Sequence, residues 1–448
     1  NNTINFIVNA SSSLSLGTHA LTGSGAFTLN GTLQVGSTDS GGAIQNSTTN
    51  GNIRVSGART FNAGSSIVYN GSSAQFIGNG HPTTSGVNCT INNASGVSLA
   101  SNATIGGNLT LTAGNLTVGS NTLTLGGNIS AGSNNIVVSS GSSLVINGSG
   151  NLGNFPFPAG PQTFANFTLN RTSGSVTFAN QVTITGSVVL NAGDLIFNGQ
   201  TLELSGTLSA TGGNLYGNSS STLIISGSGA FGELPFASGG NTIHTLTINR
   251  SSGTVSLDNA LTISNTLNLN AGELNNISGL RLSNGATLRR NSTGQLSGTA
   301  VLQSPGETYN VTYQGSSGFS TGVELPTTTA DHLGTLTIDG GPVTLTQNII
   351  VNGDLNLLNS TFNANGFNIE MAGSSRLWNK QTGVFTPGSG VVTISGNITV
   401  QATSSPQFGN LTVNSGATLT AYSGTMNISG NFQLDVGCTF NHNNGTLS

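Results

Sequence analysis

Apolar and polar residues alternate over short runs along the whole chain. In the runs 109–112, 116–118, 123–125 and 202–204, Leu or Val occupies every second position, with Thr or Glu between. Successive side chains of a β-strand point to opposite faces, so this pattern predicts strands with one buried and one exposed face. Glycine-containing pairs separate the runs and supply the backbone freedom that tight turns need. Since no stretch of twelve residues shows helical periodicity, the chain is predicted to be all-β.

The alternating runs recur at a fixed spacing of about 79 residues, which is long enough to hold several units of a repeat protein. Phe-Thr-Leu-Asn-Arg at 167–171 matches Leu-Thr-Ile-Asn-Arg at 246–250, and Asn-Ala-Gly-Asp-Leu at 191–195 matches Asn-Ala-Gly-Glu-Leu at 270–274. A third copy begins at Cys89 and follows the same pattern with a slip of one position. Repetition at this scale is typical of elongated repeat proteins, whose function is usually carried by length or by a surface.

Two all-β architectures fit short strands and frequent turns: tandem β-sandwiches and a coil that winds around one axis. Sandwich modules repeat at about 100 residues and are joined by linkers. Here similarity continues inside the long repeat, in elements of about 20 to 26 residues. The sequence therefore predicts a right-handed parallel β-solenoid (β-helix). We expect residues 1–448 to form one continuous β-solenoid segment of a longer protein.

The alternation also predicts which side chains face the interior of the coils. We expect the core to include Leu109, Leu111, Leu123, Leu125, Ile184, Leu190, Ile263 and Leu269. The regular rhythm is interrupted at 299–334, and an interval between similar elements lengthens before 371–390. Larger loops are predicted in these two segments.

Charge is unusually scarce in this chain. Charged residues make up 5% of it, against about 25% in ordinary soluble proteins, and 9 Lys and Arg against 13 Asp and Glu give a net charge of −4. A nucleic-acid partner is not expected, because a polyanion binder needs a basic stripe. Strict alternation, with 35% apolar residues, argues against disorder. No apolar run is as long as the roughly 18 residues that a membrane-spanning helix needs, so no transmembrane segment is predicted.

Several segments resemble a known family of repeats. Val-Thr-Tyr-Gln-Gly-Ser-Ser at 311–317, Thr-Gly-Val-Glu-Leu-Pro at 321–326 and Val-Asn-Gly-Asp-Leu at 351–355 are similar to the β-solenoid repeats of giant secreted surface proteins of gliding and filamentous Bacteroidetes. This resemblance covers essentially the whole chain. It implies an extracellular, cell-surface location, type IX secretion, and the role of a structural stalk, fibre or adhesive shaft that attaches to surfaces, glycans or other cells.

The low charge suggests how copies of the chain would interact. Like-charge repulsion is what normally keeps protein surfaces apart. A surface of Asn, Ser and Thr lacks that protection, so lateral homo-oligomers or fibres are a possible assembly.

An enzyme of the polysaccharide-degrading β-helix type is the alternative interpretation. Such enzymes place two or more carboxylates in one groove. Here Asp194 and Glu273 lie one long repeat apart, Asp258 stands alone, and Asn115 occupies the equivalent position in the third copy. We therefore expect no catalytic residues and no enzymatic activity.

Cofactor and metal sites are not expected either. The chain has neither a Gly-Gly-x-Gly-x-Asp calcium repeat nor a Cys-x-x-Cys pair, and its five histidines are dispersed. Asp331 and His332 near abundant serines are more typical of a surface loop than of a triad. Alternation predicts that Cys89 and Cys438 are both buried free thiols.

Two further surface features have possible functions. Short Thr-x-Thr rows, at Thr110 and Thr112 and at Thr122 and Thr124, are compatible with an ice-binding face, although exposed parallel strands favour Thr in any case.

The other feature is a tentative surface-binding site. Arg376, Trp378 and Lys380 include the only Trp and the only Lys, and they align with Arg289 and Arg290 one element earlier. An exposed aromatic beside cations would suit a sugar or an acidic glycan. The alternative is that Trp378 fills a corner of the coil and the cations cover it.

Overall fold

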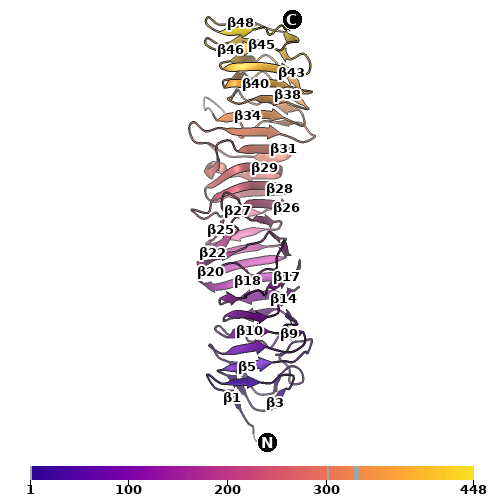
Figure 1. Cartoon of the computed structure of the whole chain (residues 1–448), viewed down its shortest axis with the longest axis vertical. Helices are drawn as coiled ribbons and strands as arrows, with labels where there is room; N and C mark the ends of the chain where they lie inside the picture. The colour runs from indigo at the N-terminus through magenta and orange to yellow at the C-terminus, as the bar shows by residue number, and fades with distance from the viewer. Residues whose placement is uncertain (1–2, 300–301, 327–331) are drawn as a thin grey trace. The chain divides into compact units, whose positions relative to one another are not determined.

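A computed structural model of the chain describes residues 3–299, 302–326 and 332–448. It is all-β, with parallel strands stacked as a β-solenoid of about 21 turns. The chain divides into two compact units, Asn1–Tyr216 (unit 1) and Gly217–Ser448 (unit 2). Within each unit, strands from successive coils follow one another along the stack, as β18 (Ser143–Ser149), β20 (Asn166–Thr177) and β22 (Val188–Ile196) do in unit 1 (Figure 1).

Unit 1 is built from ladders of parallel strands. The ladders at its start are β1 (Phe6–Val8), β4 (Phe27–Leu29), β7 (Arg59–Phe61); β3 (Leu21–Gly23), β6 (Ile53–Val55); and β2 (Ser13–Ser15), β5 (Thr32–Val35), β8 (Ser66–Tyr69), β10 (Asn88–Asn92), β13 (Leu109–Ala113), β16 (Ile129–Ser130). The later ladders are β9 (Gln75–Ile77), β11 (Val97–Leu99), β14 (Leu116–Gly119), β17 (Ile136–Val138); β12 (Ala103–Ile105), β15 (Thr122–Leu125), β18 (Ser143–Ser149), β20 (Asn166–Thr177), β22 (Val188–Ile196), with β24 (Leu208–Ala210) and β25 (Gly213–Tyr216) both on β22; and β19 (Gln162–Phe164), β21 (Val182–Ile184), β23 (Thr201–Leu204).

Unit 2 repeats this construction around one long ladder. That ladder runs through β26 (Thr222–Gly227), β28 (Thr242–Leu257), β29 (Leu261–Asn275), β31 (Thr287–Leu296), β32 (Tyr309–Tyr313), β34 (Leu333–Ile338), β37 (Leu355–Leu357), β40 (Ser374–Lys380), β43 (Asn397–Ala402), β46 (Thr418–Thr420) and β49 (Thr439–Asn441), with β27 (Gly232–Leu234) on β28 and β30 (Leu280–Leu282) on β29. The shorter ladders are β33 (Phe319–Ser320), β35 (Val343–Thr344), β38 (Thr361–Asn363), β41 (Val384–Thr386); β36 (Ile349–Val351), β39 (Ile369–Met371), β42 (Val391–Ile394), β45 (Asn410–Val413), β48 (Phe432–Leu434); and β44 (Gln407–Phe408), β47 (Thr425–Ile428), β50 (Thr446–Leu447). One 3-10 turn, η1, covers Ile277–Gly279.

The core consists of the apolar members of the alternating runs. All eight side chains predicted to point inward are at most 3% exposed, which confirms the pattern-based assignment. β15 shows the principle: Leu123 and Leu125 are buried while Thr122 and Thr124 are half-buried. Each coil places its apolar side chains directly above those of the coil before it, as where Leu123 pairs with Ala103 and Leu144. The core is therefore continuous within each unit.

The step between paired strands varies little along the chain. Leu14 pairs with Leu33, and Val311 pairs with Leu336. Such steps of roughly 19 to 25 residues are typical of one coil of a solenoid, and the long sequence repeat thus corresponds to about four coils. One step is longer than this range: Leu33 of β5 pairs with Ile67 of β8. The extra length is an excursion at 36–52, which the alternation did not predict.

The two segments predicted as larger loops differ in structure. Residues 297–308 connect β31 to β32, and the chain between β32 and β34 carries only the short strand β33 in its described part. Of the predicted segment 299–334, residues 300–301 and 327–331 lie outside the described residues. Residues 371–390 do not form one large loop, since the segment contains β40 and β41.

Two buried arginines support the longest strands where their register shifts. Arg171 and Arg250 are each 1% exposed and follow the irregularities at Asn170 and Asn249. The Arg171 guanidinium donates to the Asn147 carbonyl at 2.7 Å, and that of Arg250 donates to the Gly229 carbonyl at 2.7 Å. Burial lowers the pKa of both groups. Backbone carbonyls therefore satisfy these cations at the bends.

Asparagine side chains link successive coils at the turns. The Asn88 Oδ1 accepts the backbone N–H of Asn108 at 2.9 Å, and the Asn108 Oδ1 accepts that of Asn128 at 2.9 Å. In unit 2 the Asn348 Oδ1 accepts the N–H of Asn368, whose own Oδ1 accepts that of Val391. These Asn ladders satisfy amide groups that the turns would otherwise leave unpaired.

Candidate functional site

The predicted cations belong to one inward-facing column of unit 2. Register pairs place Leu269, Arg290, Tyr313, Ile338, Leu357 and Lys380 above one another on successive strands. We call this set the core column. Arg290 thus corresponds to Lys380, whereas sequence similarity alone aligns Arg290 with Trp378. Four strand spacings separate the two cations, or about 19 Å, so they do not form one patch.

The expectation of an exposed tryptophan is wrong. Trp378 is 1% exposed and packs against Phe385 and Phe408, with ring centroids 5.0 and 4.9 Å away. Strand register explains this placement, because Trp378 pairs with the buried Leu355 and therefore points inward. Of the five predicted surface-binding residues, only Arg289 and Arg376 are exposed. Trp378 is a core residue, as the packing interpretation had it.

Arg290 is held by a carboxylate from the segment that follows β33. Its guanidinium forms an ion pair with Glu324, which is fully buried, and donates to the Gly294 carbonyl at 2.9 Å. The same carboxylate accepts the Tyr313 hydroxyl at 2.7 Å and the Gly322 N–H at 2.8 Å. Burial, and then the nearby Glu324 charge, raises the pKa of Tyr313 well above its usual value. This cluster fastens residues 319–324 to the coil.

Lys380 is surrounded differently, although it occupies the same column. It is 7% exposed, and its Nζ donates to the Ser404 hydroxyl at 2.6 Å. No carboxylate in the described part of the chain lies within ion-pair distance of it. The ammonium therefore has a hydroxyl neighbour but no counter-ion.

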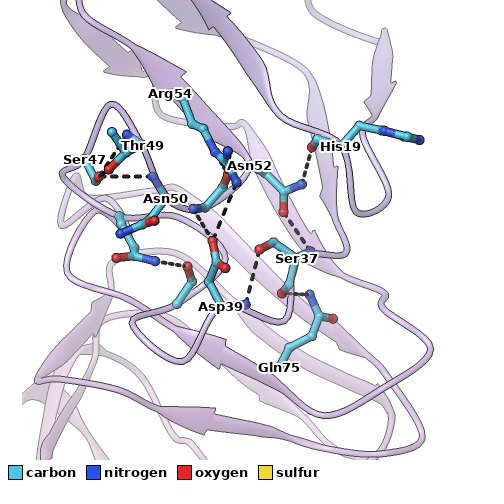
Figure 2. Close-up of polar contacts among 12 residues, drawn as sticks. His19, Ser37, Asp39, Ser47, Thr49, Asn50, Asn52, Arg54 and Gln75 are labelled. Carbon is cyan, nitrogen blue, oxygen red and sulfur yellow. Dashed lines mark hydrogen bonds and ion pairs between the residues drawn. The ribbon is translucent and has the colours of Figure 1, made fainter.

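The excursion at 36–52 forms a polar network at the start of unit 1 (Figure 2). The Asp39 carboxylate accepts the Gly51 N–H at 2.5 Å and faces Arg54 at 3.8 Å. The buried Asn52 side chain accepts the Ser37 N–H at 2.9 Å and donates to the His19 carbonyl at 2.6 Å. These contacts fix the loop by hydrogen bonds, and both members of the Asp39–Arg54 pair are partly exposed. The role of this network is therefore to hold the loop in place.

A buried histidine lies close to that excursion. His81 is 7% exposed, its Nδ1 is hydrogen-bonded to the Tyr69 hydroxyl at 2.9 Å, and its Nε2 has no partner. Burial lowers the pKa of His81 from 6.5 to about 4. The imidazole is therefore neutral at physiological pH.

Asp194 and Glu273, the two acids one long repeat apart, have different partners. Asp194 accepts the Asn214 amide at 3.0 Å, and Glu273 accepts the Ser297 hydroxyl. Within residues 3–299, 302–326 and 332–448, no three His, Cys, Asp or Glu side chains are placed to hold a metal. His332 is hydrogen-bonded to the Glu307 carbonyl at 3.1 Å. The suggested neighbour Asp331 lies outside the described residues.

The threonine rows are also short along the stack of coils. Thr110 pairs with Thr90 on one side but with Ser130 on the other, and Thr124 pairs with Thr104 and then Val145. The rows thus give way to other side chains after two coils.

The two cysteines have different surroundings, and both are free thiols. Cys89 is fully buried, and burial raises its pKa to about 12. Cys438 is only partly buried, so the prediction of burial is wrong for it. The alternation fails there because a turn with Gly437 at φ +88° separates β48 from β49.

No protein-family model, curated protein or solved structure matched the chain. The relationship to giant secreted surface proteins therefore stays a prediction from the sequence. Among the described residues, no helix has the length and apolar character that crossing a membrane requires.

Proposed function

We propose that the chain is a structural stalk, fibre or adhesive shaft of an extracellular bacterial cell-surface protein that reaches the surface by type IX secretion. The observation that carries this proposal is the parallel ladder system, in which main-chain hydrogen bonds join each coil to the next within both units. Such ladders transmit load through many equivalent bonds, and each coil is stabilised by its neighbours.

The exposed surface supports a role in attachment. Charged residues make up 5% of the chain, so the outward side chains are mainly Asn, Ser and Thr. These groups donate and accept hydrogen bonds, as glycan hydroxyls do. The partners we propose are glycans, other cells or sister copies of the chain.

Polysaccharide cleavage is the competing function. It would require two carboxylates about 5 to 9.5 Å apart across one groove. The contacts of Asp194 and Glu273 give each acid a separate neighbourhood, which favours the non-enzymatic role.

The test incubates the purified chain with immobilised acidic and neutral polysaccharides and measures both retention of the protein and release of soluble sugar. Retention, or no interaction, without any release of reducing ends or unsaturated uronates is the expected result. Release of either product that scales with protein concentration would overturn the proposal in favour of an enzyme.

A further inference from the structure

A groove on unit 2 begins beside Lys380. It has a volume of about 450 Å³, and its lining includes Asn379, Lys380, Gln381, Gln401, Tyr422 and Asn443. These residues come from the ends of β40 and β43 and from the turns that follow β46 and β49. The groove therefore crosses four successive coils on one side of the stack.

Equivalent positions of those coils carry the side chains that a sugar chain would need. Asn379 pairs with Gln401. Tyr422 and Asn443 hold the matching positions on the next two coils, because Thr399, Thr420 and Asn441 pair in register just before them. The spacing between neighbouring coils is about 4.8 Å. Three of the four coils thus contribute an amide to the groove, and the coil of Tyr422 contributes an aromatic ring.

Tyr422 is the aromatic residue that is accessible in this region. Its side chain is half-buried. Gly424 lies against its ring, since a Cβ added at Gly424 would collide with the Tyr422 Cε1. A ring held on one side and open on another is suited to packing against a sugar.

Lys380 supplies a charge whose counter-ion is missing. The other buried cations of the chain are satisfied from within: Arg171 donates to backbone carbonyls, and Arg290 is paired with Glu324. An ammonium has three N–H donors, yet Ser404 is the one partner of Lys380 in the described part of unit 2. Burying a cation without a counter-ion is costly. An anionic ligand in the groove would remove that cost.

We propose that this groove binds an acidic glycan, with a carboxylate or sulfate group on Lys380, a sugar ring on Tyr422, and hydroxyl groups on the amides of Gln401 and Asn443. This inference rests on the proposed adhesive function and gives it a site and a ligand class.

The experiment measures binding of three probes by isothermal titration calorimetry: an oligogalacturonate, the same oligosaccharide after reduction of its carboxyl groups, and a sulfated galactan oligosaccharide. The variants are Lys380→Met, Tyr422→Ala and, as a matched control, Arg376→Gln. Arg376 is an exposed cation on the same strand that does not line the groove.

We expect Lys380→Met to weaken binding of the anionic probe about ten- to a hundred-fold, because a hydrogen bond to a charged group is lost. The same change should leave the reduced probe unaffected, whereas Tyr422→Ala should weaken both probes and Arg376→Gln neither. The sulfated probe shows which anionic group is preferred. Binding of the anionic probes to the unmodified chain should also fall as salt is added.

Equal binding of the anionic probe to Lys380→Met and to the unmodified chain would overturn the proposal, as would no binding of any probe. The salt dependence is measured on the unmodified chain, so it still tests the proposal if a variant fails to fold. A chain that binds none of the probes and releases no sugar would still be a stalk, so this failure is distinct from that of the proposed function.

Discussion

Arg290 and Lys380 occupy the same core column of unit 2 but have opposite electrostatic surroundings. Arg290 meets a fully buried carboxylate, two tyrosines lie in the same cluster, and Tyr309 donates to the Glu324 carbonyl at 2.7 Å. Lys380 meets a single serine hydroxyl and lines a groove.

The difference shows how a solenoid accommodates a cation in place of an apolar residue. At Arg290 the chain adds a segment that brings its own carboxylate, so the charge is neutralised inside the protein. At Lys380 no such segment is added, and the charge stays at the edge of the core. The first arrangement satisfies the cation within the protein, whereas the second leaves the ammonium able to pair with an anionic group from outside.

Among these substitutions, an unpaired charge placed in the core column should lower the stability of the chain most. Ile338→Asp puts a carboxylate between Tyr313 and Leu357, where it has no cation. We expect the free energy of unfolding to fall by several kcal/mol, roughly the cost of burying an unpaired charge. Urea denaturation checks this. The control is Thr337→Asp on the outward face of the same strand, and an equal loss in the control would show that the column is not a core.

Breaking the internal ion pair should be the next largest effect. Arg290→Met leaves the Glu324 carboxylate buried without its cation, which should cost about 3 to 5 kcal/mol of unfolding free energy. Adding Glu324→Gln to that variant should recover most of the lost unfolding free energy, because the buried carboxylate is then replaced by a neutral amide. Arg289→Gln, the exposed neighbour, serves as the control. A double variant no more stable than Arg290→Met alone would contradict this assignment.

The buried His81 of unit 1 extends the comparison to a base that has no charge at neutral pH. The pKa of His81 is lowered from 6.5 to about 4 by burial, so the unfolded chain takes up a proton first as pH falls. Stability should therefore be complete above pH 6.5 and decrease as pH falls towards 4. The total loss would be about 3 kcal/mol.

Urea titrations at several pH values measure this slope. His81→Gln should flatten it, while His19→Gln, at an exposed position, should not. A slope unchanged by His81→Gln would show that other groups set the acid sensitivity of the unit.

Lys380→Met should have the smallest effect on stability. Its ammonium has one hydroxyl partner, so replacing it with an apolar side chain should change the unfolding free energy by less than about 1 kcal/mol or raise it. Thermal melting of this variant beside Arg290→Met makes the comparison direct. A large loss for Lys380→Met would place both cations in the same structural role.

The fold could be predicted because its signal is repeated many times. Alternation fixes the inward side of each strand, which is why Leu123 and Ile263 were assigned correctly. Alternation did not decide the side on which Trp378 lies, because the adjacent Leu377 is also apolar and the residues two positions away, Arg376 and Lys380, are charged. The rarity of Trp378 and its charged neighbours suggested exposure, and composition was a poor guide here.

The partners of the cations could not be predicted in the same way. Glu324 reaches Arg290 from a distant segment, across 34 positions of the chain, and periodicity carries no information about such contacts. The excursion at 36–52 was also missed, because its Ser, Thr, Asn and Gly residues are those of every turn in the chain. Tyr422 had no distinctive neighbours in the sequence and is recognised only when coils are stacked.

The Asn ladders give the stack a direction. In each ladder described above, the side-chain oxygen belongs to the earlier coil and the amide N–H to the later one. A completed coil therefore presents an acceptor that is already positioned before the next coil exists. A stack that ends on its C-terminal side thus presents unpaired side-chain acceptors, whereas one that ends on its N-terminal side presents unpaired amide N–H groups.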